Sequence, residues 1–252
     1  MRKTLIAVAA SLMVAPVAPT FAMKIIVTNQ VLPEILNSIT VGGTSGIDVN
    51  DDQFLDSDYW EISAAGGSVG TAIDTGAAPE RRVSLLANGS GLVFGVYDRA
   101  NVENRVPLFA SGNPEGSQYL MSILADGGVR INFQDTGVTF RRNMFGFYLT
   151  DGETTRFSDW HLNPEMSVHA VFFGGNGDLL QIGDFAPGRF AQGEWIMAWE
   201  FSDTSGGSGD FDDFVLLVES VNPVPTPGTL ALFGLGLVGV AFAMRRRRGV
   251  LS

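Results

Sequence analysis

Val215-Leu216-Leu217-Val218 is apolar at every position, and so is Met144-Phe145-Gly146-Phe147-Tyr148 apart from its glycine and the tyrosine hydroxyl. A strand with one face in solvent alternates apolar and polar residues, whereas a continuously apolar strand fits the middle of a sheet covered on both faces. These two stretches therefore predict central strands of a sheet that has no bare face.

Short apolar runs separated by Gly, Asn, Asp and Ser continue outward from these two stretches at a spacing of about ten residues. Asn88-Gly89 and Asp126-Gly127-Gly128 are turn signals between neighbouring runs. No helical pattern of 10–15 residues separates the runs, which argues against a βαβ architecture. We expect a mainly β protein, a single antiparallel β-sandwich of jelly-roll-like type, with a short helix over 33–39. The expected strands are 24–31, 59–63, 68–73, 82–87, 92–97, 106–110, 119–125, 129–133, 139–140, 144–150, 168–173, 179–182, 195–201 and 214–220.

The N-terminus has the three parts of a secretory signal peptide. Arg2 and Lys3 provide the charge, residues 5–14 the apolar core, and Ala22 the small residue after which signal peptidase cuts. The alternative is an uncleaved membrane anchor, for which the apolar core is short. We expect residues 1–22 to be a signal peptide read by the Sec machinery and residues 23–222 to be one exported domain.

The C-terminal residues 223–252 begin with a proline-rich break, continue as an apolar run over 229–244 and end in four arginines. As a helix, the 16-residue run would be about 24 Å long, which is short of a bilayer core of about 30 Å. Arginines at its end would hold it on the cytoplasmic side. A buried core helix is the alternative, but such a helix would not end in four arginines. We expect a transmembrane segment that serves as a temporary anchor.

This tail resembles the PEP-CTERM sorting signal of exported proteins in Gram-negative bacteria. Thr226 stands where that family usually has Glu. The resemblance implies processing by the membrane protease-transpeptidase exosortase, an inner-membrane tether with a periplasmic body, and later transfer to the outer envelope or the exterior. It also implies an association with exopolysaccharide or biofilm. The residues that carry the resemblance are Val224, Pro225, Thr226, Pro227, Gly228, Thr229, Arg245, Arg246, Arg247 and Arg248.

The amino-acid composition excludes several classes of site and partner. The chain has no cysteine, which excludes disulfides, thiol nucleophiles and cysteine metal sites. Six of its 16 basic residues and none of its 27 acidic residues lie in the two terminal segments, so the body has 10 basic residues and a net charge of −17. Such a body repels nucleic acid and anionic lipid and attracts cations.

The body resembles the domain of unknown function numbered 4114, as it occurs in PEP-CTERM proteins. That resemblance implies a β fold and an exported context, and it implies no reaction. Phe201-Ser202-Asp203 departs from the family's usual Asp-Leu, and the following spacer is longer. The matching stretches are 94–98, 135–138, 145–149 and the ending 199–200 with 209–215.

That ending is the strongest candidate site in the sequence. Closely spaced carboxylates beside a glycine-rich loop can converge on a hard cation such as Ca²⁺, which takes six to eight oxygen ligands. The alternative is a solvated acidic loop whose aspartates cap turns. The candidate ligands are Glu200, Asp203, Asp210, Asp212 and Asp213.

Three other patterns are weaker. The second acidic segment contains Asp48, Asn50, Asp51, Asp52, Asp56 and Asp58. Its start has the spacing of the first half of an EF-hand loop, but Gln53 and Tyr59 occupy positions that require Gly and Glu, so a loop that binds Ca²⁺ in another way is the alternative. His161 and His169 are eight residues apart, which does not predict a zinc site. Trp195 and Trp199 are expected on one side of a strand, and core packing or a sugar-stacking platform would each use that side. The tryptophans weighed for such a platform are Trp60, Trp160, Trp195 and Trp199.

The sequence thus predicts a non-enzymatic envelope or extracellular-matrix protein that an exosortase sorts, with Ca²⁺ and extracellular polysaccharide as candidate ligands. We identify no catalytic residue. The alternative is an exported hydrolase of glycosidase type that uses Asp or Glu pairs, because two acids can come together in a fold without any sequence motif.

Overall fold

The structure is a computed structural model that describes residues 25–54, 59–62, 81–88, 91–202, 204 and 208–224. Among these residues, the strands form two larger antiparallel sheets. The first, in spatial order, contains β18 (Val221–Val224), β3 (Tyr59–Ile62), β10 (Phe145–Thr150), β5 (Val93–Asp98) and β6 (Asn101–Ala110), with β11 (Thr155–Phe157) paired to β10. The second contains β2 (Gln53–Phe54), β12 (Ala170–Gly174), β15 (Glu194–Trp199), β17 (Phe214–Glu219), β4 (Arg81–Asn88), β7 (Gln118–Ile123), β8 (Gly128–Ile131) and β9 (Gln134–Thr139).

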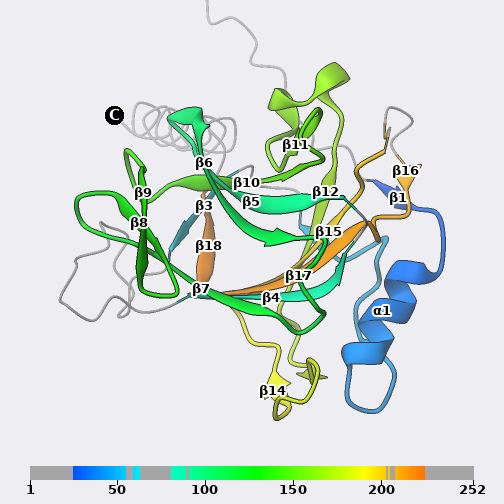
Figure 1. The fold of residues 1–252 in the computed structure, drawn as a ribbon. Helices are drawn as coiled ribbons and strands as arrows, with labels where there is room; N and C mark the ends of the chain where they lie inside the picture. Colours follow the sequence, from blue (N-terminus) through cyan, green and yellow to red (C-terminus); the bar gives the residue numbers. More distant parts are fainter. Residues whose placement is uncertain are drawn as a thin grey trace, which may run out of the picture.

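Smaller elements surround these sheets (Figure 1). β1 (Ile26–Val27) pairs in parallel with β16 (Ser208–Gly209), and β13 (Leu179–Leu180) pairs with β14 (Gly188–Arg189). The helix α1 (Val31–Ile39) lies beside β1, and two 3-10 turns, η1 (Trp160–Leu162) and η2 (Pro164–Met166), follow β11. The predictions of a mainly β protein, of antiparallel sheets and of the short helix are therefore confirmed.

The apolar strand β17 is covered on both faces, as its sequence predicts. Phe214, Leu216 and Val218 belong to a large core that also takes side chains from the first sheet, among them Phe94 and Trp60. Val215 and Leu217 point the other way, into a second core that includes Leu32 and Leu36 of α1. The ring of Phe94 in β5 stacks on Phe214 with centroids 5.7 Å apart, so the two sheets share one interior.

The other apolar stretch forms β10, which is likewise covered on both faces. Phe145, Phe147 and Leu149 enter the shared core. On the outer face, Tyr148 packs with Tyr97 and Phe157. Gly146 leaves room for this layer, because a Cβ at that position would lie 2.3 Å from the Tyr97 ring. Central placement, predicted for both stretches, is confirmed.

Several strand bounds differ from the sequence prediction. The expected strand over 24–31 is limited to β1, because Val31 already begins α1, where Asn29 Oδ1 accepts the Val31 amide at 3.0 Å. β6 begins at Asn101, five residues earlier than predicted, because Asp98 caps a tight turn by accepting the Ala100 amide at 2.9 Å. The expected strand over 68–73 lies outside the described residues.

β18 joins the body to the C-terminal tail. It pairs with β3, so that Val221 lies opposite Ile62 and Val224 opposite Tyr59. Pro223, which cannot donate a backbone hydrogen bond, fits this position because β18 is the outermost strand of its sheet. Ordered sheet therefore continues to within one residue of Pro225.

Candidate functional site

The predicted acidic residues come together where β15 and β17 run side by side. β15 ends at Trp199 and β17 begins at Phe214, and these two residues are opposite each other in the sheet. Glu200 follows the first strand. The residues before the second strand are Asp210, Asp212 and Asp213. We call these four residues the acidic ending; Asp203, the fifth predicted ligand, lies outside the described residues.

Glu200 is the centre of the acidic ending, with only 4% of its surface exposed. Its Oε1 accepts the Ser202 amide at 2.9 Å, and its Oε2 accepts the Asp210 and Phe211 amides at 3.1 and 3.4 Å. Burial alone would raise the pKa of Glu200, but hydrogen bonds from the Asp210 side chain and from the Ser202 and Asp210 amides outweigh it and lower the pKa to about 2. The carboxylate is thus ionised and held by the loop that it organises.

Asp210 has the opposite electrostatic character. The hydrogen bond with Glu200, burial, and the negative charges of Glu200 and Asp212 raise the pKa of Asp210 to about 7. Its Oδ2 accepts from Asn29 Nδ2 at 3.2 Å, which ties the acidic ending to the start of the body. Glu200 and Asp210 therefore share one proton over the pH range between their two pKa values.

Asp213 fixes the other side of the loop. Its Oδ2 accepts the Phe201 amide at 2.8 Å, and its own amide donates to the Trp199 carbonyl at 3.1 Å. Burial raises the pKa of Asp213, and the charges of Glu200 and Asp212 add to that shift. Asp213 thus closes the β15–β17 connection through backbone groups.

Phe211 anchors the loop, and sequence reasoning missed it. Its side chain is fully buried in the second core, although its φ of +54° is one that residues with a Cβ rarely adopt. Burial of the ring offsets the strain of about 1–2 kcal/mol that a left-handed backbone costs. The only sequence signal is a phenylalanine between aspartates in an otherwise polar loop.

The described part of the acidic ending holds a proton between two carboxylates and satisfies backbone amides. Within the described residues, no group of three or more His, Asp or Glu side chains has the geometry to hold a metal ion. Because the predicted set also includes Asp203, Ca²⁺ binding stays a prediction.

The second acidic segment folds as a capped turn. Asp48 Oδ1 accepts the Asn50 and Asp51 amides at 2.9 and 3.2 Å, and Asp52 Oδ2 accepts the Asp48 amide at 2.8 Å. Asn50 Oδ1 accepts the Val27 amide at 2.9 Å. β2 follows directly, where an EF-hand would need a helix. These carboxylates therefore organise the local backbone; Asp56 and Asp58 lie outside the described residues.

The two histidines have separate partners. His161 Nδ1 lies 3.1 Å from Asp159 Oδ1, and its ring contacts that of Trp160 with centroids 3.8 Å apart and planes tilted by 30°. His169 is buried, with Nδ1 2.7 Å from the Glu200 carbonyl and Nε2 2.9 Å from Ser167 Oγ.

The Ser167–His169 contact is the arrangement of a nucleophile and a base, which sequence reasoning missed. Both residues are buried, at 6% and 1% exposure, and Ser167 Oγ also lies 2.8 Å from the Pro164 carbonyl. The pair therefore connects η2 to the end of β15 and offers no open approach for a substrate.

Three of the four tryptophans are core residues. Trp195 and Trp199 lie on the same side of β15, as predicted, and that side faces the shared core, where Trp195 contacts Trp60 with ring centroids 5.0 Å apart. Trp60 and Trp199 are fully buried. Trp60 and Trp199 are therefore closed to a sugar, and Trp195, which is partly buried, packs against the shared core. Trp160 stands apart on η1.

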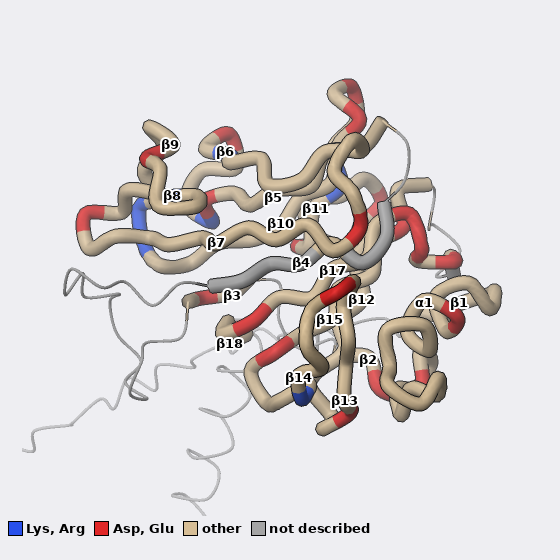
Figure 2. The backbone as a smooth tube through the Cα atoms, turned by 60° about the horizontal axis from the view of Figure 1, so that its bottom comes forward, with Lys and Arg blue, Asp and Glu red and all other residues tan. Residues whose placement is uncertain are grey.

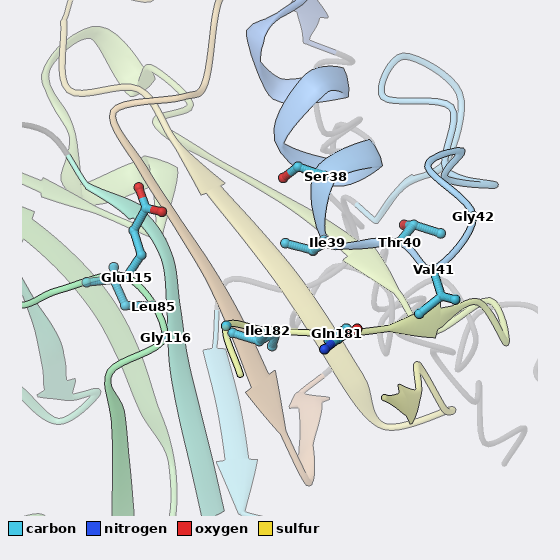
Figure 3. A pocket seen from close by; sticks show the side chains of 11 residues that line it. Ser38, Ile39, Thr40, Val41, Gly42, Leu85, Glu115, Gly116, Gln181 and Ile182 are labelled. Carbon is cyan, nitrogen blue, oxygen red and sulfur yellow. The ribbon is translucent and has the colours of Figure 1, made fainter. Parts of the chain in front are cut away.

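A cavity of about 590 Å³ lies between the end of α1, the segment after β13 and the connection before β7. Figure 3 shows Ser38 and Ile39 on one side of it, Glu115 on the other, and Gln181 and Ile182 below. Its volume suits a small ligand, but Glu115 is the only titratable residue among the described residues that line it. The cavity therefore provides no pair of groups for acid–base chemistry.

Residues 223–248 match the PEP-CTERM protein-sorting motif. The motif indicates an exported protein that is anchored in the membrane and then processed by an exosortase. The match begins at Pro223, within β18, and does not extend into the rest of the body. Comparison with curated proteins gives no match, and comparison with solved structures gives none either.

Most of the motif, including the apolar run over 229–244 and the four arginines, lies outside the described residues, as do Ala22 and the expected signal peptide. Among the residues that are described, no helix is both long and apolar enough to cross a bilayer.

Proposed function

We propose that this chain is a non-enzymatic protein of the Gram-negative envelope or extracellular matrix, whose jelly-roll-like β-sandwich body is released or transferred by an exosortase. The observation that carries the proposal is the sorting motif at 223–248. Export through Sec and removal of residues 1–22 by signal peptidase belong to the same proposal, as does a relationship of the body to the domain of unknown function numbered 4114.

The junction between body and tail supports release or transfer of the folded body by an exosortase. β18 keeps its pairing with β3 as far as Val224. An exosortase acting near Pro225 to Thr229 would therefore meet a short peptide next to an ordered edge strand. Cutting there would leave both large sheets intact.

The polar groups of the body support a role without catalysis. Glu200 and Asp213 are engaged by backbone amides, and Ser167 and His169 are buried. The largest of the described cavities has a single carboxylate, Glu115. Turnover of any member of a panel of polysaccharides by the purified protein would overturn the proposal in favour of the hydrolase.

The sorting role is tested by replacing Arg245, Arg246, Arg247 and Arg248 with serine in the producing cell. Because the arginines hold the apolar run in place, we expect a smaller membrane-bound fraction and loss of the processed form. Four lysines at the same positions form the matched control, which keeps the charge and should keep the membrane fraction. Serine and lysine variants that both behave like the parent would contradict the stop-transfer role.

We further propose that Ca²⁺ binds the acidic ending in place of the proton shared by Glu200 and Asp210, with Asp203 as an additional ligand, and that the loaded body contacts extracellular polysaccharide. The raised pKa of Asp210 supports this, because the carboxylates need a proton or a cation between them.

Thermal melting of the purified protein in Ca²⁺ and in chelator tests the Ca²⁺ proposal. A ligand that binds only the native state must raise the melting temperature, and the rise should be larger at pH 8 than at pH 5, where the proton competes. Asp184→Asn is a control on an exposed loop and should keep the response that Asp210→Asn loses. Equal melting temperatures with and without Ca²⁺ would exclude the cation.

A further inference from the structure

Three arginines line one pocket at the end of the first sheet. Arg99 lies in the turn between β5 and β6, and Arg141 and Arg142 lie in the connection between β9 and β10. Together with Asp98, Ala100 and Met144, they enclose about 280 Å³. Arg141 and Arg142 are exposed, and Arg99 is half-buried. We call these three residues the arginine patch.

Asp98 holds the two arginine-bearing segments together. It is 2% exposed; its Oδ1 accepts the Ala100 amide at 2.9 Å and its Oδ2 accepts the Arg141 amide at 3.0 Å. The carboxylate thus accepts hydrogen bonds from the backbone of both connections, the one between β5 and β6 and the one between β9 and β10. It fixes the geometry of the patch and forms no ion pair with the arginine side chains.

The guanidinium groups of the patch have no carboxylate partner within 4.0 Å among the described residues. Arg99 Nη1 lies 3.5 Å from Met144 Sδ, and its guanidinium lies 4.2 Å from the centre of the Tyr59 ring. Glu61 and Asp126 line a neighbouring pocket that Arg141 and Arg142 share, at distances beyond ion pairing.

Concentrated positive charge is unusual in this body. Its net charge is −17, and Figure 2 shows Asp and Glu on many segments and Lys and Arg on few. By contrast, Arg105 is paired with Glu103 at 3.6 Å and lies over the Phe157 ring. Among the described residues, the three guanidinium groups around this pocket have no carboxylate partner, so they are available to an external anion.

The patch is next to the point where the tail leaves the body. Arg99 lies over Tyr59, and Tyr59 is opposite Val224 in the β3–β18 pair. Only residues 225–228 separate Val224 from the apolar run. Even fully extended, that connection spans no more than about 18 Å. While the tail is in the membrane, the arginine patch must therefore lie close to the bilayer surface.

We propose that the arginine patch binds anionic phospholipid headgroups and orients the tethered body on the membrane. Guanidinium groups bind phosphate in a bidentate manner, and basic residues beside a membrane anchor are attracted to anionic lipid. The remaining acidic surface is repelled, so one orientation is favoured. In that orientation α1, which lies on the other side of the body from β6 in Figures 1 and 2, faces away from the bilayer. This inference rests on the membrane tether of the proposed function.

The full chain, reconstituted in vesicles, provides the test. The native sequence has no cysteine, so a fluorophore can be attached at Ala100→Cys, in the patch, or at Ser38→Cys, on exposed α1. Vesicles of phosphatidylcholine alone or mixed with phosphatidylglycerol carry a quencher on their headgroups. We expect strong quenching at position 100 only with phosphatidylglycerol, and weak quenching at position 38 in both.

The variant Arg99→Gln/Arg141→Gln/Arg142→Gln should lower the ratio of docked to undocked body by roughly 100-fold, because each basic residue near an anionic surface contributes about 1 kcal/mol, or roughly fivefold. Salt at about 1 M, which shortens the screening length to about 3 Å, should have a similar effect on the parent. Arg189→Gln, an exposed arginine on β14, is the matched control and should dock like the parent.

Flotation of the same vesicles separates this inference from the tether on which it rests. Protein that floats with both lipid mixtures but is quenched equally at position 100 would overturn the arginine patch and leave the tether intact. Protein that floats with neither mixture would overturn the tether. A body that binds a soluble uronate polymer through the three arginines and stays unquenched in both mixtures would also overturn lipid docking.

Discussion

The acidic ending and the arginine patch are both clusters of like charge on loops between strands, but the protein uses them differently. In the acidic ending, Glu200 and Asp213 accept backbone amides, and Asp210 shares a proton with Glu200. In the arginine patch, Asp98 accepts hydrogen bonds from the Ala100 and Arg141 amides, and the guanidinium groups have no carboxylate partner among the described residues. The carboxylates of the acidic ending have hydrogen-bond partners within the chain, whereas the guanidinium groups of the arginine patch are open to an external partner.

The difference shows that charge density alone does not identify a binding site. The acidic ending is the more conspicuous cluster in the sequence, yet its carboxylates carry much of the loop's structure. The arginines are dispersed over more than 40 positions of the chain and converge only because β10 lies next to β5. Removal of the Glu200 carboxylate should therefore cost stability, whereas removal of the arginine charges should cost binding.

The largest effect on stability is expected for Glu200→Ala. The substitution leaves the Phe211 amide and two other backbone donors without their acceptor, at a cost of about 2–3 kcal/mol in the free energy of unfolding. Urea denaturation measures this cost. Glu153→Ala, at an exposed turn position, is the control and should change stability by no more than about 0.5 kcal/mol. Equal effects of the two substitutions would contradict a structural role for Glu200.

An intermediate effect that depends on pH is expected for Asp210→Asn. The pKa of Asp210 is raised from 3.8 to about 7, so the native state keeps a proton that the unfolded state has lost. This contribution to stability is complete below pH 4 and disappears as the pH rises through 7. The pKa of Glu200 is lowered to about 2, so its contribution is complete above its ordinary pKa of 4.5 and disappears as the pH falls through 2.

The parent should therefore lose stability between pH 5 and pH 8, and Asp210→Asn should not, because its amide donates to Glu200 at every pH. At pH 8 we expect the variant to be more stable by about 1 kcal/mol, after allowance for solvent screening of a partly exposed group. Melting temperatures across this pH range provide the measurement. A parallel pH dependence of parent and variant would show that Asp210 does not retain the proton.

The smallest effect on stability is expected in the arginine patch. Arg141→Gln/Arg142→Gln keeps both backbone positions and removes two exposed charges, so the free energy of unfolding should change by less than about 0.5 kcal/mol. The change should favour the variant slightly at low salt, because these like charges have no carboxylate partner among the described residues. A loss above 1 kcal/mol would place these arginines in the structure rather than at a binding surface.

The fold was predictable where burial dominates. The apolar stretches at 144–148 and 215–218 form β10 and β17, and both faces of each strand are covered. α1 covers part of one face of β17. Asp126-Gly127-Gly128 forms the predicted turn between β7 and β8, with the Leu124 amide bonded to the Gly128 carbonyl at 2.9 Å. The pattern of apolar residues along a strand and the residue types of a tight turn are local properties, so they can be read from the sequence.

Elements that depend on distant partners were not predictable. β16 exists because β1 lies beside it, 182 positions earlier in the chain, and β18 exists because β3 provides an open edge. The acidic ending was predicted as a cluster, but the division between an ionised Glu200 and a protonated Asp210 depends on amides that only the fold brings near. The arginine patch has no sequence signature beyond Arg141-Arg142.

The most direct test of the account is the C-terminus of the mature protein, determined by mass spectrometry of material from the producing cell. We expect a chain that lacks the residues beyond about Pro227 and has lost its four tail arginines, while β18 stays in the sheet. A mature protein that still ends at Ser252 would contradict exosortase processing and leave the tail as a permanent anchor.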